Sequence, residues 1–276
     1  MSEIIITSVQ NPRIKQLLTL QQKSSERRKS GLFVVEGRRE LQHCLDAGYE
    51  VERVFVSSQF TVHSSELPAA GNAAQPNSQF SILNSQFITV SPQVYEKMAY
   101  RGSTEGVIAI VRSRPLTLDD LQLPESPLVV VLESVEKPGN LGAVLRSADA
   151  ARADAVIVCD PLTDLYNPNL IRASIGAVFT VPCVACSTEQ CIAFLRDRDI
   201  SILTAQLQDS HLYYDTDMTG PTALVMGTEA TGLTQPWREA AAAHIRIPML
   251  GRLDSLNVSV STAILLFEAV RQRQLL

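Results

Sequence analysis

Residues 127–149 read PLVVVLESVEKPGNLGAVLRSAD, and this stretch decides the fold. It opens with six apolar residues, among them three consecutive valines, as in a strand that is buried on both faces. A turn with Pro138, Gly139 and Asn140 follows, and apolar residues then recur at spacings of three and four, which predicts a helix over 140–151. Asn140 is therefore expected at or near the helix N-cap. Strand, turn and helix in this order build ligand sites at the carboxyl edge of parallel sheets, although a capped helix start alone would explain the turn equally well.

The composition predicts a folded protein with a substantial core, since 45% of the 276 residues are hydrophobic and 19% are charged. This length suits one large domain or two modest ones. The sequence has neither a long uninterrupted apolar run nor a signal-peptide pattern, so we expect a cytoplasmic protein without a membrane span. Two of the five cysteines, Cys183 and Cys186, have the spacing of half a zinc site. No second Cys/His pair follows at finger-like spacing, so we expect buried free thiols and no metal.

The N-terminal part of the chain is basic, in contrast to the whole. Residues 1–42 hold eight lysines and arginines against four glutamates, a local charge of +4 in a chain whose formal net charge is −5. A solvated charged face would explain this excess, but phosphate contacts with a nucleic acid would explain it too. We predict that the residues contacting RNA are Arg27, Arg28, Lys29 and Arg38.

Residues 1–111 are predicted to form a small α/β domain, with strands at 31–37, 51–56, 87–90 and 105–111 and helices at 38–47 and 92–99. Residues 57–88 are rich in Ser, Asn and Gln and repeat the tetrapeptide NSQF, which is typical of a low-complexity surface insertion. Residues 112–126 contain two prolines and are the predicted linker.

From residue 127 onward, strand and helix patterns alternate. We predict strands at 127–132, 155–159, 179–184, 200–206, 222–227 and 244–247. The predicted helices are 140–151, 168–176, 188–198, 235–242 and 255–273. Such alternation implies a doubly wound parallel sheet with helices on both faces.

Two further motifs follow later strands of this predicted sheet. Residues 227–233 read GTEATGL, where two glycines five apart let the backbone approach a ligand closely, although an ordinary tight turn would also explain them. The middle glycine of the dinucleotide-binding fingerprint is missing. The third motif is IPM at 247–249 followed by SLNVS at 255–259, where Ser255 or Asn257 would suit a helix N-cap.

Together and in this order, N-x-G-x-x-x-R, G-x-E-x-x-G-L and I-P-M with S-L-N-V-S resemble the motifs of the SpoU (TrmH-type) RNA ribose 2′-O-methyltransferases of the SPOUT superfamily. The resemblance implies an α/β protein whose C-terminal catalytic domain, residues 127–276, is a doubly wound parallel sheet with a deep trefoil knot. The FVVEG and EGVIAIV segments of residues 1–111 are similar to those of the L30e-like RNA-binding domain that precedes the catalytic domain in many members.

The resemblance also implies the chemistry. The cofactor would be S-adenosylmethionine, the substrate a ribose 2′-hydroxyl of RNA, with ribosomal RNA favoured over transfer RNA, and the protein a homodimer paired through the knot region. The implied cofactor-binding residues are Gly227, Gly232, Ile247, Met249 and Leu256. The implied catalytic residues are Arg146, Asn140, Glu229, Ser255 and Asn257.

Arg146 is the residue that the resemblance places at the reacting hydroxyl. Arginine keeps its proton at neutral pH, so a guanidinium that holds the phosphate and stabilises the developing alkoxide is easier to defend than a literal base. The structural alternative is a salt bridge with Glu133 or Glu229. Two other functions stay open, namely an RNA-binding relative without catalysis and a small-molecule enzyme with a nucleotide cofactor. The basic N-terminal region argues against the second of these.

Overall fold

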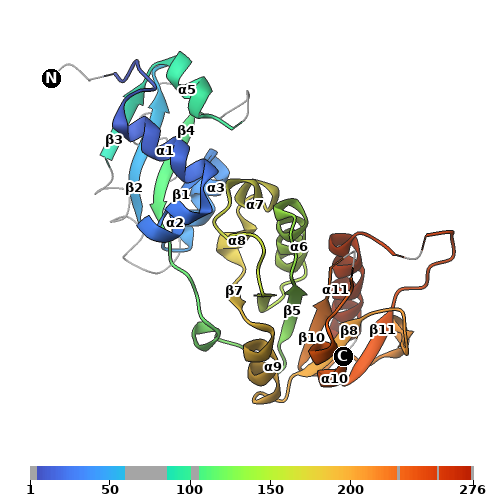
Figure 1. Cartoon of the computed structure of the whole chain (residues 1–276). Coiled ribbons are helices and arrows are strands. Elements are labelled where there is room, and N and C mark those ends of the chain that lie inside the picture. Colours follow the sequence, from blue (N-terminus) through green and yellow to red (C-terminus); the bar gives the residue numbers. More distant parts are fainter. Residues whose placement is uncertain (1–4, 60–85, 101–105, 229–230, 254, 275–276) are drawn as a thin grey trace. The chain divides into compact units, whose positions relative to one another are not determined.

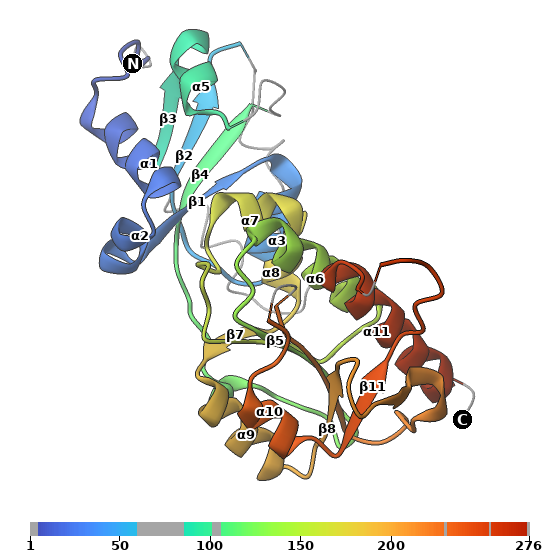
Figure 2. The ribbon, with the colours of Figure 1, turned by 45° about the vertical axis from the view of Figure 1, so that its right-hand side comes forward.

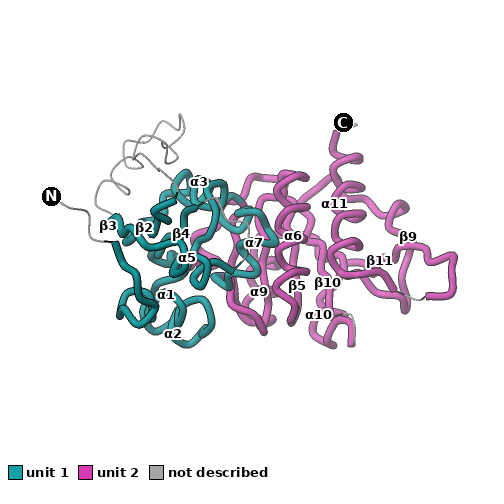
Figure 3. Tube along the Cα trace, turned by 90° about the horizontal axis from the view of Figure 1, so that it is seen from above, with its two compact units in different colours: residues 1–114, 166–180 teal, residues 115–165, 181–276 magenta. Residues whose placement is uncertain are grey.

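The chain folds into two compact units (Figure 3). The computed structural model describes residues 5–59, 86–100, 106–228, 231–253 and 255–274. The first unit contains residues 1–114 and 166–180, and the second contains residues 115–165 and 181–276. The segment 166–180, which the sequence pattern assigns to the C-terminal domain, thus clusters with the N-terminal one. No helix of the described residues has the length and apolar character needed to cross a membrane.

The first unit is a four-stranded sheet with helices (Figure 1). Its strands run in the order β1-β4-β2-β3, and only the β2–β3 pair is parallel. The strands are β1 (Leu32–Glu36), β2 (Val51–Ser57), β3 (Gln86–Val90) and β4 (Val107–Arg112). The helices are α1 (Pro12–Gln22), α2 (Ser24–Ser30), α3 (Arg38–Asp46), α5 (Pro92–Met98), α7 (Pro168–Ala173) and α8 (Ala177–Thr180).

All four predicted strands of this unit and the helices α3 and α5 are confirmed to within two residues. The bounds of the predicted insertion are wrong, because β2 continues to Ser57 and β3 begins at Gln86. The rest of that segment, residues 60–85, lies outside the described residues. Helices α1 and α2 were not predicted.

An aromatic cluster holds the segment 166–180 in the first unit. The ring of Tyr166 stacks on Phe33 of β1 with 4.5 Å between centroids, and Phe179 of α8 lies 5.9 Å from Phe33 and 5.2 Å from Tyr49. The side chain of Phe33 is fully buried. Aromatic contacts of this kind contribute stability beyond the area that they bury, and they join residues more than 100 positions apart, which is why periodicity could not reveal them.

Arg27, predicted to contact RNA, is instead a structural residue of the α1–α2 corner. Its side chain is buried, with 5% exposed, and its guanidinium donates hydrogen bonds to the carbonyl oxygens of Leu20 (2.6 Å) and Gln21 (3.2 Å) at the end of α1. These carbonyls belong to the last turn of a helix, where no intrahelical N–H remains to pair with them. Arg28 and Lys29, the next two residues, are exposed.

The second unit contains a seven-stranded sheet in the order β7-β6-β5-β10-β8-β11-β9, and all its strand pairs are parallel. Its strands are β5 (Leu128–Glu133), β6 (Ala155–Cys159), β7 (Cys183–Cys186), β8 (Ser201–Ala205), β9 (His211–Leu212), β10 (Thr222–Met226) and β11 (Ala243–Arg246). Its helices are α6 (Pro138–Ala150), α9 (Thr188–Arg196), α10 (Gln235–Ala240) and α11 (Val258–Gln274).

Helices cover both faces of this sheet (Figures 1 and 2). Val129 and Val131 of β5 share a core with α9 and α10, in which Trp237 is fully buried. Because successive side chains of a strand point to opposite faces, Val130 and Leu132 face the other side, where α6 packs against α11. The predicted doubly wound parallel sheet is therefore confirmed. Of the predicted strand 179–184, only the end is strand, since α8 occupies 177–180.

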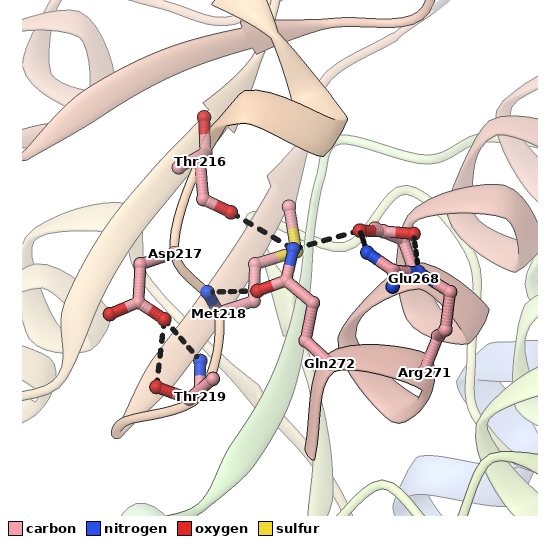
Figure 4. Close-up of polar contacts among 7 residues, drawn as sticks. All are labelled: Thr216, Asp217, Met218, Thr219, Glu268, Arg271 and Gln272. Atoms are coloured by element: carbon pink, nitrogen blue, oxygen red, sulfur yellow. Dashed lines mark hydrogen bonds and ion pairs between the residues drawn. The ribbon is translucent and has the colours of Figure 1, made fainter. Parts of the chain in front are cut away.

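The C-terminal end of α11 is tied to the loop that leads into β10 (Figure 4). The side-chain amide of Gln272 accepts a hydrogen bond from the backbone N–H of Met218 (2.8 Å) and donates one to the carbonyl of Thr216 (3.0 Å). Arg273 donates to the carbonyls of Met218 and Gly220, and burial lowers the pKa of its guanidinium. Arg271 pairs with Glu268 one turn earlier, at 2.7 Å.

The environment of Arg27 predicts a stability difference between neighbouring arginines. Arg27→Ala is expected to lower the free energy of unfolding by about 2 kcal/mol, because it removes charge-assisted hydrogen bonds from buried carbonyls. Arg28→Ala, at an exposed site on the same helix, is the matched control and is expected to change it by less than about 0.5 kcal/mol. Urea denaturation followed by circular dichroism measures both, and equal effects of the two substitutions would contradict the assignment.

Candidate functional site

A cavity of about 380 Å³ opens at the carboxyl ends of β8, β10 and β11 in the second unit. This is the edge at which parallel sheets bind ligands, and the volume lies in the range of sites for small molecules. Most of the cavity wall comes from three segments, namely the loop after β8, the second motif after β10, and the third motif between β11 and α11, and residues of α10 and α11 complete it.

The second motif forms a tight turn in which both glycines are required by the backbone. A Cβ atom on Gly227 would collide with the backbone of Gly232 and come within 2.6 Å of the backbone nitrogen of Leu233. Gly232 has a φ of +68°, a conformation that residues with a side chain rarely adopt. The backbone N–H of Gly232 donates to the carbonyl of Thr228, which closes the turn. Glu229, the predicted catalytic residue of this motif, lies outside the described residues.

The five residues predicted to bind the cofactor all line this cavity: Gly227, Gly232, Ile247, Met249 and Leu256. Ser255, predicted as catalytic, lines it too. Asn140, Arg146 and Asn257 are not among the lining residues. The structure thus gathers motifs two and three around one cavity, and their binding role remains a prediction.

The first and third motifs meet through their asparagines. The side-chain amide of Asn257 donates to the side-chain oxygen of Asn140 at 3.2 Å, across 117 positions of sequence. Asn257 also caps α11, since its side-chain oxygen accepts from the backbone N–H of Ser259 at 3.0 Å. The N-cap predicted at Ser255 or Asn257 is therefore confirmed at Asn257. Asn140, expected at or near the N-cap of its helix, lies near it in the first turn: the N-cap is Lys137 and α6 begins at Pro138, which suits a first helical position because its missing N–H has no partner there.

Arg146 lies exposed on α6, six residues and nearly two turns beyond Asn140. Within the described part of the chain its guanidinium takes part in no hydrogen bond or ion pair. The salt bridge that would make it structural is not formed with Glu133. That buried carboxylate instead accepts hydrogen bonds from the hydroxyl and backbone N–H of Thr234 and from the hydroxyl of Thr188.

Two polar residues of the cavity were missed from the sequence. Gln206 follows β8 and Arg238 lies on α10, and both line the cavity. The Oε1 atom of Gln206 and the Nε atom of Arg238 are buried without a hydrogen-bond partner among the described residues. Buried polar atoms are rarely left unpaired, so these two are candidate ligand contacts. The signal for Gln206 was its position at the end of a predicted strand, but no motif surrounds it.

The predicted RNA-contacting residues differ in exposure. Arg28 and Lys29 are exposed and Arg38 is half-buried, whereas Arg27 is buried as described above. Contact with RNA therefore stays a prediction for the first three, and the phosphate contact at Arg27 is not carried further.

Comparison with known families agrees with this geometry. The model of the SpoU rRNA Methylase family matches residues 127–267, which contain all three motifs and the cavity. The chain belongs to the SpoU family. A second model, the MRM3-like substrate binding domain, matches residues 11–109.

Relatives of the family match this SpoU chain over most of its length. The 23S rRNA (guanosine-2′-O-)-methyltransferase RlmB of Pectobacterium atrosepticum is 37% identical over 66% of this chain and 78% of its own. The 23S rRNA (uridine(2479)-2′-O)-methyltransferase of Streptomyces viridochromogenes is 29% identical over 97% of this chain and 92% of its own. A crystal structure of an AdoMet-bound rRNA methyltransferase from Sinorhizobium meliloti superimposes with a TM-score of 0.84, at 29% identity and 97% coverage of both chains.

Proposed function

We propose that this SpoU protein transfers a methyl group from S-adenosylmethionine to a ribose 2′-hydroxyl of 23S ribosomal RNA. The observation that carries the proposal is the meeting of the three motifs, two of them around one cavity and the first joined to the third by the Asn140–Asn257 hydrogen bond. Family membership and the named activities of two relatives support it. Those relatives modify a guanosine and a uridine, and what they share is the ribose 2′-oxygen. A ribosomal substrate also supports the cytoplasmic location expected from the sequence.

The residues that line the cavity fit the chemical groups of the cofactor. S-adenosylmethionine is a zwitterion with a nucleoside, and when bound it supplies a methyl group on a positively charged sulfur. The glycine turn and Ile247, Met249 and Leu256 offer backbone and apolar contacts. The unpaired Nε of Arg238 is a donor suited to a carboxylate, and Oε1 of Gln206 is an acceptor suited to an amino group.

We assign to Arg146 the task of holding the RNA at the reacting ribose. Its exposed guanidinium has no partner among the described residues and can bind a phosphate through two parallel hydrogen bonds. In that position it also stabilises the negative charge that develops on the 2′-oxygen as the methyl group is attacked, so alignment and charge stabilisation supply the rate enhancement. Asn140 and Asn257 hold the first and third motifs together, and Ser255 and Glu229 are the remaining candidates for orienting the substrate.

Two further features of the family, a trefoil knot and a homodimer, are proposed for this chain. The trefoil knot is proposed because the chain belongs to the SpoU family, whose motifs it carries in order. The homodimer is supported by Val260 and Phe267 of α11, whose side chains are 46% and 49% exposed. They are seven residues apart and so lie on the same face of the helix, where a second copy would cover them.

The first unit supplies a surface for the RNA. Arg28 and Lys29 stand exposed at the end of α2, and Arg38 begins α3. Contacts from such residues to phosphates are independent of sequence and weaken as the salt concentration rises. We propose that they hold the RNA backbone and take no part in the chemistry.

Arg146→Ala is expected to reduce methyl transfer at least about 100-fold, as loss of a group that stabilises developing charge does. Cofactor affinity should not change. Arg146→Lys should restore little activity, because an ammonium cannot make the paired contacts of a planar guanidinium. Turnover with a radiolabelled methyl donor and 23S rRNA measures this, and Arg196→Ala, at an exposed arginine of α9, is the matched control. Retention of a third or more of wild-type turnover by Arg146→Ala would show that Arg146 is structural.

Gly227→Val is expected to abolish cofactor binding, because its side chain would collide with the backbone of Gly232 and Leu233 and distort the turn that lines the cavity. Calorimetric titration with S-adenosylhomocysteine measures the affinity, and circular dichroism checks that the chain remains folded. Gly251→Ala is the control, since a Cβ at Gly251 meets no atom within 4 Å. Unchanged affinity in folded Gly227→Val would place the cofactor elsewhere.

The homodimer is expected to show a mass of about twice 30.2 kDa in light scattering at micromolar concentration. Val260→Asp combined with Phe267→Asp should give the monomer mass, because charges on both side chains would have to be buried in the interface. Phe87→Asp changes an exposed aromatic residue of the first unit and should leave the dimer intact. A monomeric wild-type protein would refute the proposal.

A further inference from the structure

Three of the five cysteines gather at one point of the second unit. Cys159 ends β6, Cys186 ends β7, and Cys191 lies in the first half of α9. Their sulfur atoms all lie within 4.8 Å of one another. Cys159 and Cys186 are direct partners in the parallel ladder between β6 and β7, so their side chains leave the sheet on the same face, and α9 brings the third sulfur onto them.

The cluster is not the pair that the spacing suggested. Cys183 and Cys186 are three residues apart on one strand, so their side chains point to opposite faces and cannot share an ion. Cys183 and Cys44 are buried outside the cluster. None of the three clustered cysteines lines the cofactor cavity, so the cluster is a separate feature of the molecule.

The spacing of the sulfurs matches the coordination of a metal ion. For three atoms no more than 4.8 Å apart, some point lies within about 2.8 Å of each of them. A zinc–thiolate bond is about 2.3 Å long, so an inward shift of about 0.5 Å per sulfur would complete three bonds. Rotation of a cysteine side chain accomplishes such a shift without movement of the backbone.

The chemistry of the cluster favours a thiophilic ion. Thiolates select Zn²⁺ or Cu⁺ over harder cations. Cys159 and Cys191 are completely buried, while Cys186 is only partly buried and leaves a path by which an ion and a fourth ligand such as water can enter.

We propose that Cys159, Cys186 and Cys191 form a binding site for Zn²⁺, with the fourth position open to water. Three zinc–sulfur bonds form, the thiol protons leave to solvent, and no oxidation state changes. The site revises the expectation of a protein without metal. Its effect is structural, because the bound ion links the ends of β6 and β7 to α9.

The site can be tested with Zn²⁺ alone on the full chain, purified with a phosphine reductant and stripped with a chelator. Titration against a chromophoric zinc indicator should show about one tight site per chain, and the melting temperature should rise as the ion binds the folded state. Cd²⁺ should produce the ultraviolet absorption of cadmium–thiolate bonds, which reports sulfur ligation directly. Cys159→Ser, Cys186→Ser and Cys191→Ser should each remove that absorption and weaken Zn²⁺ binding at least about 100-fold. Cys44→Ser and Cys183→Ser are matched controls and should change neither.

The melting temperature without metal shows whether a variant has lost the zinc site or is merely destabilised. A variant that has lost only the site melts like metal-free wild type. Cys186→Ser is the most informative, because its partly exposed side chain tolerates substitution; it should melt like metal-free wild type and gain nothing from Zn²⁺. Zn²⁺ binding that survives all three substitutions would place the ion elsewhere and overturn the proposal. So would the absence of binding by reduced wild-type protein, or mass spectra in which Cys186 forms a disulfide with a neighbour instead of binding the ion.

Discussion

The position of α11 is the constraint on which the rest of the second unit depends. Its first turn is capped by Asn257, which also donates to Asn140 of α6, and its last turn is bound through Gln272 and Arg273 to the loop before β10. A helix attached at both ends cannot slide along the sheet. The segment that precedes it carries the third motif, and residues of this segment and of the second motif's turn line the same cavity.

Much of this unit could be predicted because its signals are local. The run of valines at 129–131 indicates a buried strand, because a helical pattern follows it directly. Alternation of strand and helix patterns along the chain then indicates a parallel sheet. Gly227 and Gly232 could be recognised for the same reason. Close backbone contact at the first position and a positive φ at the second each favour glycine, and glycine can be read directly from the sequence. Five residues that line the cavity could be named because the second and third motifs resemble those of the SpoU family, and both motifs follow strands whose carboxyl ends share one edge of the sheet.

What escaped prediction depends on contacts between distant parts of the chain. The charge of Arg27 suggested a phosphate contact. In the folded protein its guanidinium instead donates to carbonyl oxygens at the end of α1, which approach it only when α1 and α2 pack together. Residues 166–180 follow the strand–helix pattern of the second unit and still cluster with the first, through Tyr166 and Phe179 on Phe33. Gln206 and Arg238 belong to no motif, and the third sulfur of the cysteine cluster comes from a helix instead of the C-x-x-C pair.

The pairing of Glu133 explains how a cation is left available in an acidic protein. Glu133 ends the strand that precedes the first motif, and its carboxylate would be a natural partner for Arg146. In the structure this carboxylate instead accepts hydrogen bonds from two threonines: Thr188, the first residue of α9, and Thr234, which stands at the N-cap position of α10. An unpaired carboxylate in that buried position would be costly, and neutral hydroxyl donors remove the cost without using a cation. The one arginine of the first motif is thus exposed, and a chain with a formal net charge of −5 can still present a positive group that is able to bind a polyanion.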